Sequence, residues 1–247
     1  MAVLEKLGGA RGVKPRKKTR MDENVIFEDG DIVVVDKPAG RIVHAAPGHG
    51  EVSLADSLAK SRPGMADVGS RERPGVVHRL DIETSGVMVF AKTRRAYLRL
   101  RETFESHCNL TKTYLAVLHG APKPASGTME TTIGRKPWDP KRMAVGVPGG
   151  KRAITEWTTL KRLGSLALVE FVIKTGRTHQ IRVHAAHLGH PIVGDSLYGD
   201  KAKDARLPIR PGRLLLHAVA LEFPHPVTGK TVSFAARPPD DILYPGV

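Results

Sequence analysis

The stretch "HRLDIETSG", residues 78–86, brings a histidine, an arginine and two acids together within six residues and ends on Thr84, Ser85 and Gly86. Strand-like apolar runs lie on both sides of it. Polar groups this dense cost free energy when they are buried without partners, so the stretch is poor core material. It is a candidate functional site, and Asp81 at its centre is the residue whose role needs an explanation.

The sequence around this stretch predicts many strands and a few helices. Runs rich in β-branched residues between turn signals predict strands at residues 24–28, 32–36, 87–92, 112–120, 128–134, 142–148, 152–163, 166–176, 214–223 and 230–236. Helix patterns cover residues 53–62, 93–107 and 178–191. Short turns favour antiparallel pairing, and strands do not alternate regularly with helices. We therefore expect an α+β fold built on a mixed, mainly antiparallel β-sheet flanked by helices.

The three helices carry recognisable signals. Ser53 is a plausible N-cap, with Asp56 three residues later. The other two helices have apolar residues at helical spacing, namely Tyr97, Leu100 and Phe104 in one and Ile181, Ala185 and Leu188 in the other. We expect the last helix to open at Thr178 and to close at Gly189.

The composition favours a polyanionic partner. The 247 residues include 39 Lys and Arg against 25 Asp and Glu, which gives a net charge of +14. This excess favours nucleic acid, although basicity could also serve solubility alone. No apolar run approaches the ~20 residues of a membrane span. The start shows no signal-peptide core, and Cys108 is the single cysteine. We expect a cytoplasmic protein with no membrane partner.

The basic run "KPRKKTR" falls within residues 1–21, which contain few apolar residues. We interpret these residues as a disordered N-terminal arm, either a phosphate-contacting tail or a solvated one without a role. Residues 22–240 are expected to form one domain.

Several site types do not fit the sequence. A protein kinase would need a glycine-rich phosphate loop and an Asp-Phe-Gly segment, and a Walker loop would need glycines before a Lys-Ser pair; neither occurs. Of His179, His184, His187 and His190, only His184 and His187 share a spacing of three residues on a helix. No cysteine or acid is placed to complete a tetrahedron with them, so we expect no metal and no nucleotide cofactor.

The stretch at residues 78–86 resembles the catalytic motif of the RluA family of RNA pseudouridine synthases, which reads His-Arg-Leu-Asp, two free positions, then Thr-Ser-Gly. Three other segments are similar to that family: "VVVDKPAGRIVH", "KTYLAVLHG" and "TGRTHQIRVHAAHLGHPIVGDSLYG". The resemblance covers residues 24–237 and makes residues 22–240 a pseudouridine synthase catalytic domain. Many relatives carry a small RNA-binding domain ahead of it, and the ~20 residues available here are too few to encode one.

The resemblance implies a reaction that suits these residues. Uridine becomes pseudouridine when the bond from ribose to the base nitrogen breaks, the uracil turns, and carbon 5 is joined to the ribose. Nothing is gained or lost, so neither metal nor cofactor is needed. Asp81 is the expected nucleophile, by attack on the anomeric carbon or by assisting elimination through a glycal. The alternative is that Asp81 caps the following turn.

The resemblance assigns Arg182 as the cation that keeps Asp81 charged in a water-poor pocket. Arg182 could instead be an exposed helix charge that touches phosphate. Ile181 either walls the base pocket or belongs to the core.

Tyr114 is expected to stack on the uracil, with an ordinary core tyrosine as the alternative. Arg79, two residues before Asp81 and on the same side of an extended segment, is assigned to flipping the uridine out of its stack. His78 and Thr84 are candidate RNA-site residues that brace the loop. Lys37 is expected in a turn near the RNA surface, although a simple loop fits almost as well.

The sequence does not identify the RNA. Ribosomal and transfer RNA remain open as partners, as does the uridine that is modified, and we expect a monomer. Two other functions compete with isomerisation: a nucleoside or base hydrolase that uses the same carboxylate, and an RNA-binding module without catalysis.

Overall fold

A computed structural model describes residues 25–45, 52–243 and 245. The arm predicted at residues 1–21 lies outside the described residues. Contacts gather the chain into two compact units. The first contains the chain up to Leu110 together with Ala220–Arg237, and the second contains Thr111–Val219 together with the residues from Pro238 onward. Residues 22–240 are expected to form one domain, and each unit carries part of the predicted site.

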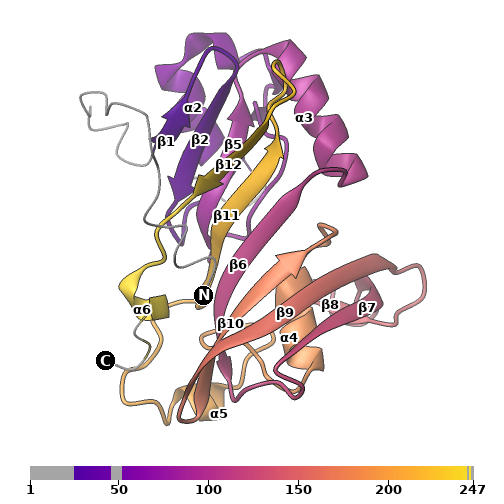
Figure 1. The fold of residues 1–247 in the computed structure, drawn as a ribbon, viewed down its shortest axis with the longest axis vertical. Helices are drawn as coiled ribbons and strands as arrows, with labels where there is room; N and C mark the ends of the chain where they lie inside the picture. Colours follow the sequence, from indigo (N-terminus) through magenta and orange to yellow (C-terminus); the bar gives the residue numbers. More distant parts are fainter. Residues whose placement is uncertain (1–24, 46–51, 244, 246–247) are drawn as a thin grey trace. The chain divides into compact units, whose positions relative to one another are not determined.

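The first unit is built on a sheet with a buried centre (Figure 1). Its strand order is β1-β2-β5-β11, and β12 pairs with β11. The strands are β1 (Val25–Glu28), β2 (Ile32–Lys37), β5 (Ser85–Ala91), β11 (Leu216–Pro224), of which the last part belongs to this unit, and β12 (Thr231–Ala235). All of β5 and nearly all of β2 are buried, as their continuous apolar runs predict.

The helices of this unit begin where the sequence predicts. Helix α2 (Leu54–Ser61) has a capping box, in which Ser53 Oγ accepts a hydrogen bond from the Asp56 N–H and Asp56 accepts one from the Ser53 N–H. Helix α3 (Arg94–Ser106) buries Leu100 and Phe104 and packs on β5. Between them lie a short 3-10 helix, η1 (Pro63–Met65), and a small hairpin of β3 (Gly69–Ser70) and β4 (Arg73–Pro74), which the sequence analysis did not predict.

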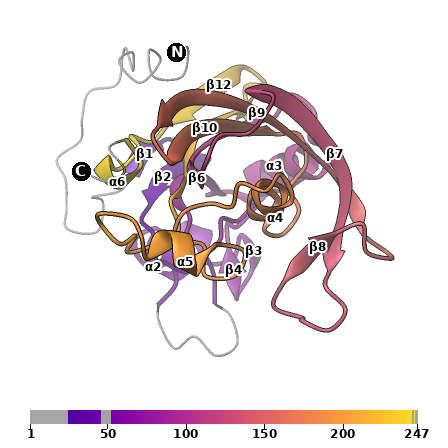
Figure 2. The ribbon, with the colours of Figure 1, turned by 90° about the horizontal axis from the view of Figure 1, so that it is seen from below.

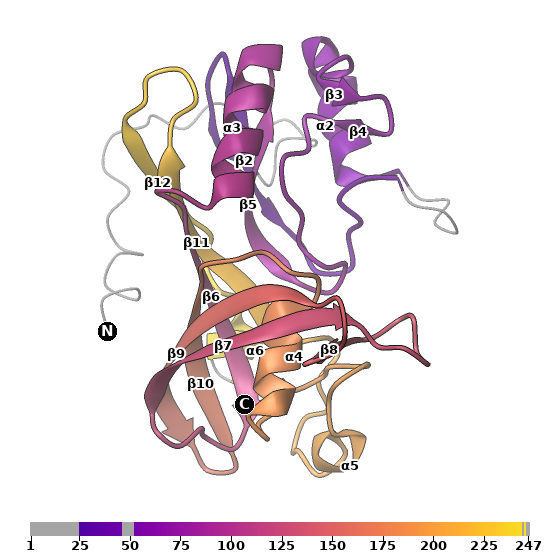
Figure 3. The same cartoon turned by 90° about the vertical axis from the view of Figure 1, so that its right-hand side faces the viewer.

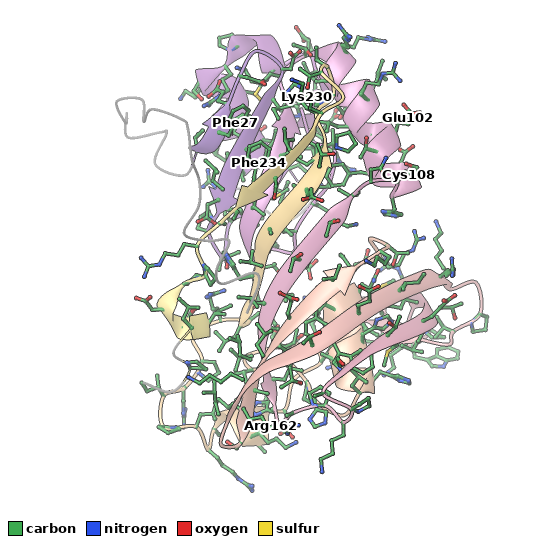
Figure 4. All side chains as sticks on the ribbon, in the orientation of Figure 1. Phe27, Glu102, Cys108, Arg162, Lys230 and Phe234 are labelled. Carbon is green, nitrogen blue, oxygen red and sulfur yellow. The ribbon has the colours of Figure 1, made fainter. Side chains whose placement is uncertain are left out.

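Strand β12 pairs with β11 and also contacts β1. Figure 4 shows Phe234 of β12 beside Phe27 of β1, and their ring centroids lie 5.1 Å apart. The His225 ring also reaches Asp29 in the turn between β1 and β2, with Nε2 2.9 Å from the carboxylate. The last stretch of the unit is thus joined to its first two strands.

The second unit is an antiparallel sheet that curves around one helix. Its strand order is β11-β6-β10-β9-β7-β8. The strands are β6 (Thr111–His119), β7 (Ser126–Arg135), β8 (Met143–Val145), β9 (Lys151–Leu163) and β10 (Leu166–Ile173). Figures 2 and 3 show β7 and β9 bending around α4 (Gln180–His187). Two short helices complete the unit, α5 (Lys201–Asp204) and α6 (Asp240–Leu243).

Helix α4 differs from its prediction. It begins at Gln180 rather than Thr178, because His179 takes the left-handed conformation with φ 56°. Every residue from Gln180 to Ala185 is buried, so its first turns show no polar outer face. The curved sheet packs around the helix, so residues on more than one face of the helix are buried, whereas an amphipathic helix would bury only one.

The α+β fold on a mixed, mainly antiparallel sheet is therefore confirmed. Among the helices of the described residues, none combines the length and the apolar character that a membrane crossing requires.

Candidate active site

The motif loop of the first unit leads into strand β5. The Thr84 N–H donates to the Asp81 carbonyl over 3.1 Å, and the Gly40 N–H donates to the Ile82 carbonyl over 2.8 Å. The segment before this turn alternates, since Arg79 is exposed, Leu80 is buried and Asp81 is partly exposed. This alternation matches an extended segment in which Arg79 and Asp81 face the same side. The Asp81 carboxylate therefore lies on a turn that backbone hydrogen bonds hold in place.

His78 and Thr84 are held within this unit. The Val89 N–H of β5 donates to His78 Nε2 over 3.1 Å, and the His78 ring stacks on Phe104 of α3 with centroids 4.4 Å apart. Because Nε2 accepts, the proton of a neutral ring sits on Nδ1. Thr84 is buried. The contacts of His78 therefore attach the start of the motif to β5 and α3, and Thr84 is buried at its end, just before β5.

Lys37 lies in a different place from its prediction. It is the last residue of β2, not part of a surface turn, and its side chain is fully buried at 0% exposure. Its ammonium donates to the Pro38 and Ile82 carbonyls, each over 2.9 Å. A buried ammonium needs such acceptors. The Ile82 carbonyl belongs to the loop that carries Asp81, and Pro38 directly follows Lys37. The expected surface turn at Lys37 is therefore wrong, and Lys37 supports the motif loop from inside. Its contact with RNA stays a prediction.

In the second unit, Arg182 forms a buried ion pair on α4. Its Nε and Nη2 donate to the two carboxylate oxygens of Asp195 over 2.8 and 2.7 Å. Arg182 is only 3% exposed, which contradicts the alternative of an exposed helix charge. The two parallel hydrogen bonds fix the plane of the guanidinium.

Asp195 is itself fixed by the backbone that follows it. Its Oδ1 accepts hydrogen bonds from the Leu197 and Tyr198 N–H groups over 2.9 and 3.0 Å. Burial alone would raise the pKa of the Asp195 carboxyl, but the hydrogen bonds and charge of Arg182, with these N–H groups, hold it below its ordinary value. Asp195 therefore stays ionised beside Arg182 at neutral pH.

Tyr198 covers the same guanidinium. The Arg182 Cζ lies 5.3 Å from the Tyr198 ring centroid, within range of a cation–π interaction. The Tyr198 hydroxyl accepts a hydrogen bond from the Met143 N–H over 2.7 Å and lies 2.8 Å from His179 Nδ1. Neither Asp195 nor Tyr198 is among the predicted site residues, although both lie in the segment that resembles the family's arginine helix and following loop.

A chain of buried polar groups attaches α4 to the sheet. Gln180 Oε1 accepts from the Thr175 hydroxyl over 2.7 Å, and Gln180 Nε2 donates to the Ile154 carbonyl and to Thr155 Oγ1, each over 2.9 Å. Thr155 Oγ1 lies 2.8 Å from His184 Nδ1. The chain ties the first turn of the helix to strand β9.

Both ring nitrogens of His184 are hydrogen-bonded in this chain. Nδ1 lies 2.8 Å from Thr155 Oγ1, and Nε2 lies 2.8 Å from Thr131 Oγ1. Burial, and to a smaller extent the charge of His187, lowers the pKa of His184 to about 4. His184 is therefore a neutral ring at neutral pH, held by a threonine hydroxyl at each nitrogen.

Tyr114 and Ile181 are both buried in the second unit, at 8% and 4% exposure. Tyr114 shares a face of β6 with Lys112. The Lys112 ammonium donates to the Thr175 carbonyl over 3.3 Å, and burial, followed by the charge of Arg177, lowers its pKa to about 8.

The predicted site residues thus fall into two groups. His78, Arg79, Asp81, Thr84 and Lys37 come together in the first unit. Tyr114, Ile181 and Arg182 belong to the second unit. The pairing of Asp81 with Arg182 spans the two groups and stays a prediction. In the part of the chain that the structure describes, no three His, Cys, Asp or Glu side chains gather as a metal site would require.

A model of the RNA pseudouridylate synthase family matches residues 31–187, which is more than half of the chain. The chain belongs to the RNA pseudouridylate synthase family. The match includes the motif loop, β6 and all of α4, which ends at His187. The resemblance to the RluA family that the sequence predicts is confirmed.

Relatives extend this family match to nearly the whole chain. An uncharacterized RNA pseudouridine synthase of Synechocystis is 39% identical over 220 residues, which are 87% of this chain and 65% of that protein. A protein named ribosomal large subunit pseudouridine synthase D, from Neisseria meningitidis, is 41% identical over 90% of this chain and 59% of its own length. The chain therefore spans somewhat less than two thirds of these curated relatives.

A solved structure has the same fold. The human protein named RNA pseudouridylate synthase domain containing 1 superposes with a TM-score of 0.71 and 26% identity. The superposition covers 92% of this chain and 87% of the human one. The family assignment thus agrees in sequence and in fold.

Proposed function

We propose that this protein isomerises specific uridines in structured RNA to pseudouridine, with Asp81 as the catalytic carboxylate. The observation that carries the proposal is the complete motif around Asp81, which places a partly exposed acid on a loop that buried Lys37 supports from inside. Membership of the RNA pseudouridylate synthase family supports the same reaction.

The reaction balances without a cofactor. The bond between ribose C1′ and uracil N1 breaks, Asp81 either bonds to C1′ or assists loss of the C2′ proton, and the released uracil turns. Carbon 5 then bonds to C1′ as the Asp81–C1′ bond breaks or, on the glycal route, as the proton returns to C2′. The proton on carbon 5 is then lost, and N1 is protonated. The protein needs only to hold the charge, the base and the ribose in place.

The second unit supplies the remaining groups. Arg182, held by Asp195 and Tyr198, keeps the Asp81 carboxylate ionised when water is excluded. Tyr114 stacks on the uracil, a contact that tolerates rotation of the base, and Ile181 walls its pocket. In the first unit, exposed Arg79 fills the gap that the flipped uridine leaves.

Large-subunit ribosomal RNA is the substrate that we propose. It is the substrate class in the name of the Neisseria relative, and the net charge of +14 suits a polyanion. The alternative substrate is transfer RNA, and the test below distinguishes the two. We place the protein in the cytoplasm, where it acts as a monomer.

The test uses unmodified transcripts of large-subunit ribosomal RNA and of transfer RNA. We expect pseudouridine at one or a few positions of the ribosomal transcript with wild-type protein, and none with Asp81→Asn, which should still bind the transcript. Asp67→Asn, an exposed acid on the same unit, is the matched control and should react like wild type.

Each alternative has its own result. Free uracil and abasic RNA would indicate a hydrolase, and RNA binding without modification by wild type would indicate a binding module. Near-normal turnover by Asp81→Asn would refute the role of Asp81.

A further inference from the structure

The hairpin between β7 and β8 ends in an exposed tryptophan. Trp138 is 97% exposed, more than any other large apolar side chain in the described part of the chain. The next most exposed are Val52 at 61% and Leu98 at 57%. A free indole face costs solvation free energy and is the kind of feature that marks a binding surface.

Cations flank Trp138 in the sequence of the hairpin tip, which we define as residues 135–142. Arg135, Lys136 and Lys141 are exposed, and Arg142 is partly exposed. Asp139 is the one acid of the tip, and it lies 3.3 Å from Arg142. The tip therefore combines an aromatic face with a net positive charge, which suits a ligand that has both a flat ring and phosphate.

The tip is held in one conformation. The Lys136 N–H donates to the Arg142 carbonyl and the Arg142 N–H donates to the Asp139 carbonyl, each over 2.9 Å. The Arg135 guanidinium donates to the Pro140 carbonyl. Because the loop is already ordered, a ligand would not have to order it on binding.

The base of the hairpin is fixed to the environment of Arg182. Met143, the first residue of β8, donates its N–H to the Tyr198 hydroxyl, and the Tyr198 ring covers the Arg182 guanidinium. Met143 and Tyr198 also pack with Val183 of α4 in one apolar cluster. The hairpin tip therefore has a defined position relative to the arginine of the proposed reaction.

We propose that the hairpin tip binds an unpaired nucleotide of the RNA substrate outside the target uridine, with the base stacked on Trp138 and the phosphates beside Lys136 and Lys141. This inference rests on the proposed function for its ligand. A protein partner would also suit an exposed tryptophan, but the surrounding lysines and arginines favour a polyanion.

The first experiment measures binding of a single-stranded oligouridylate. Trp138→Ala should weaken binding about 5- to 150-fold, the range that loss of one stacked base produces. Trp138→Phe should recover part of the affinity because a ring remains. Leu98→Ala, another exposed apolar side chain but on α3, is the control and should bind like wild type.

Fluorescence reports whether the indole itself is contacted. The chain has two tryptophans, and Trp157 is buried at 7% exposure. Oligouridylate should quench the emission of wild-type protein, and the quenching should be lost in Trp138→Phe, where Trp157 remains. Equal quenching in both proteins would overturn the stacking contact.

Kinetics on the transcript that wild type modifies separate this proposal from the proposed function. Trp138→Ala should raise KM for that transcript and leave kcat nearly unchanged. An unchanged KM and unchanged oligouridylate affinity would overturn the hairpin proposal while the isomerase assignment stands. Binding that depends on Trp138 in a protein that modifies no transcript would instead leave the hairpin proposal standing and overturn the isomerase.

Discussion

The buried pair of Arg182 and Asp195 determines what a substitution at either residue can do. Both side chains are almost completely removed from water, and two parallel hydrogen bonds join them. Removing one member of a buried pair leaves the other charge in a medium that solvates it poorly. A loss of activity in a single variant would therefore mix a chemical effect with a folding effect.

A double variant separates the two effects. Arg182→Met or Asp195→Asn alone should lower the free energy of unfolding by about 3–5 kcal/mol, because each leaves a buried charge without this partner. Arg182→Met combined with Asp195→Asn should recover much of that stability and still fail to isomerise uridine. Urea unfolding and pseudouridine formation on the same samples provide the measurement.

Asp67→Asn serves as the control for these variants, and its unfolding free energy should stay within about 0.5 kcal/mol of wild type. An active double variant would remove Arg182 from the mechanism. Single variants as stable as wild type would mean that the pair contributes little to the fold.

At the scale of the element, helix α4 depends on a polar chain as well as on apolar packing. Gln180 and His184 sit on successive turns and reach Thr155 of β9 together. Protonation of the His184 ring would place a charge in this buried chain, which burial disfavours. The orientation of α4, and with it that of Arg182, is therefore sensitive to acid.

Acid should destabilise the protein through His184. The pKa of His184 in the folded protein is about 4, below its ordinary value of 6.5, because burial and then His187 disfavour the charged ring. As the pH falls below 6.5 the unfolded chain takes up the proton first, so stability is lost between pH 6.5 and 4. The size of this loss is about 3 kcal/mol.

The measurement compares the free energy of unfolding of wild type and His184→Gln from pH 7 to pH 4. Groups that titrate in both proteins contribute equally to both curves and cancel when one curve is subtracted from the other. The free energy of unfolding of His184→Gln should therefore fall by about 3 kcal/mol less than that of wild type over this pH range. His187→Gln, at an exposed position one turn away, should keep most of the wild-type decline. Parallel curves for wild type and His184→Gln would contradict the assignment.

Most strands were predictable from the sequence because their signal is local. The run "IVVVDK" of β2 and the run "SGVMVFA" of β5 have the continuous apolar character of buried strands. The N-terminal capping box of α2 was also predictable, since Ser53 and Asp56 lie within one turn of each other. The hairpin of β3 and β4 was missed, because strands of two residues leave almost no pattern.

The candidate site was predictable only in part. The motif identified Asp81, but the burial of Lys37 could not be read from the sequence, because lysines are almost never fully buried and this one depends on a carbonyl 45 residues away. The start of α4 was also misplaced, since the conformation of His179 and the polar chain behind Gln180 depend on strands elsewhere in the chain. The role of Asp195 could be recognised only in the structure, where its carboxylate accepts two hydrogen bonds from Arg182.

At the scale of the whole molecule, charge should govern how RNA is held. Lys and Arg exceed Asp and Glu by 39 to 25 over the full sequence. Binding of single-stranded RNA releases counterions from each phosphate that the protein neutralises, so affinity falls as salt rises. If about four phosphates are contacted, a fourfold rise in salt should weaken oligouridylate binding about 50-fold.

A salt titration of oligouridylate binding tests this expectation. Lys136→Ala with Lys141→Ala should lower the slope of log affinity against log salt by about 1.4, if each lysine contacts one phosphate. The control is Lys161→Ala on β9, a site outside the proposed hairpin contact. A slope near zero for wild type would mean that charge does not drive the binding.

The first unit is assembled from two separated stretches of the chain, one that ends at Leu110 and one from Ala220 to Arg237. The second stretch carries Phe234 and His225, which contact Phe27 and Asp29 of the first. Truncation at Leu110 would therefore expose apolar surface where these side chains pack. To isolate this half in the laboratory, an engineer would have to join Leu110 to Ala220 by a new linker or supply both fragments together.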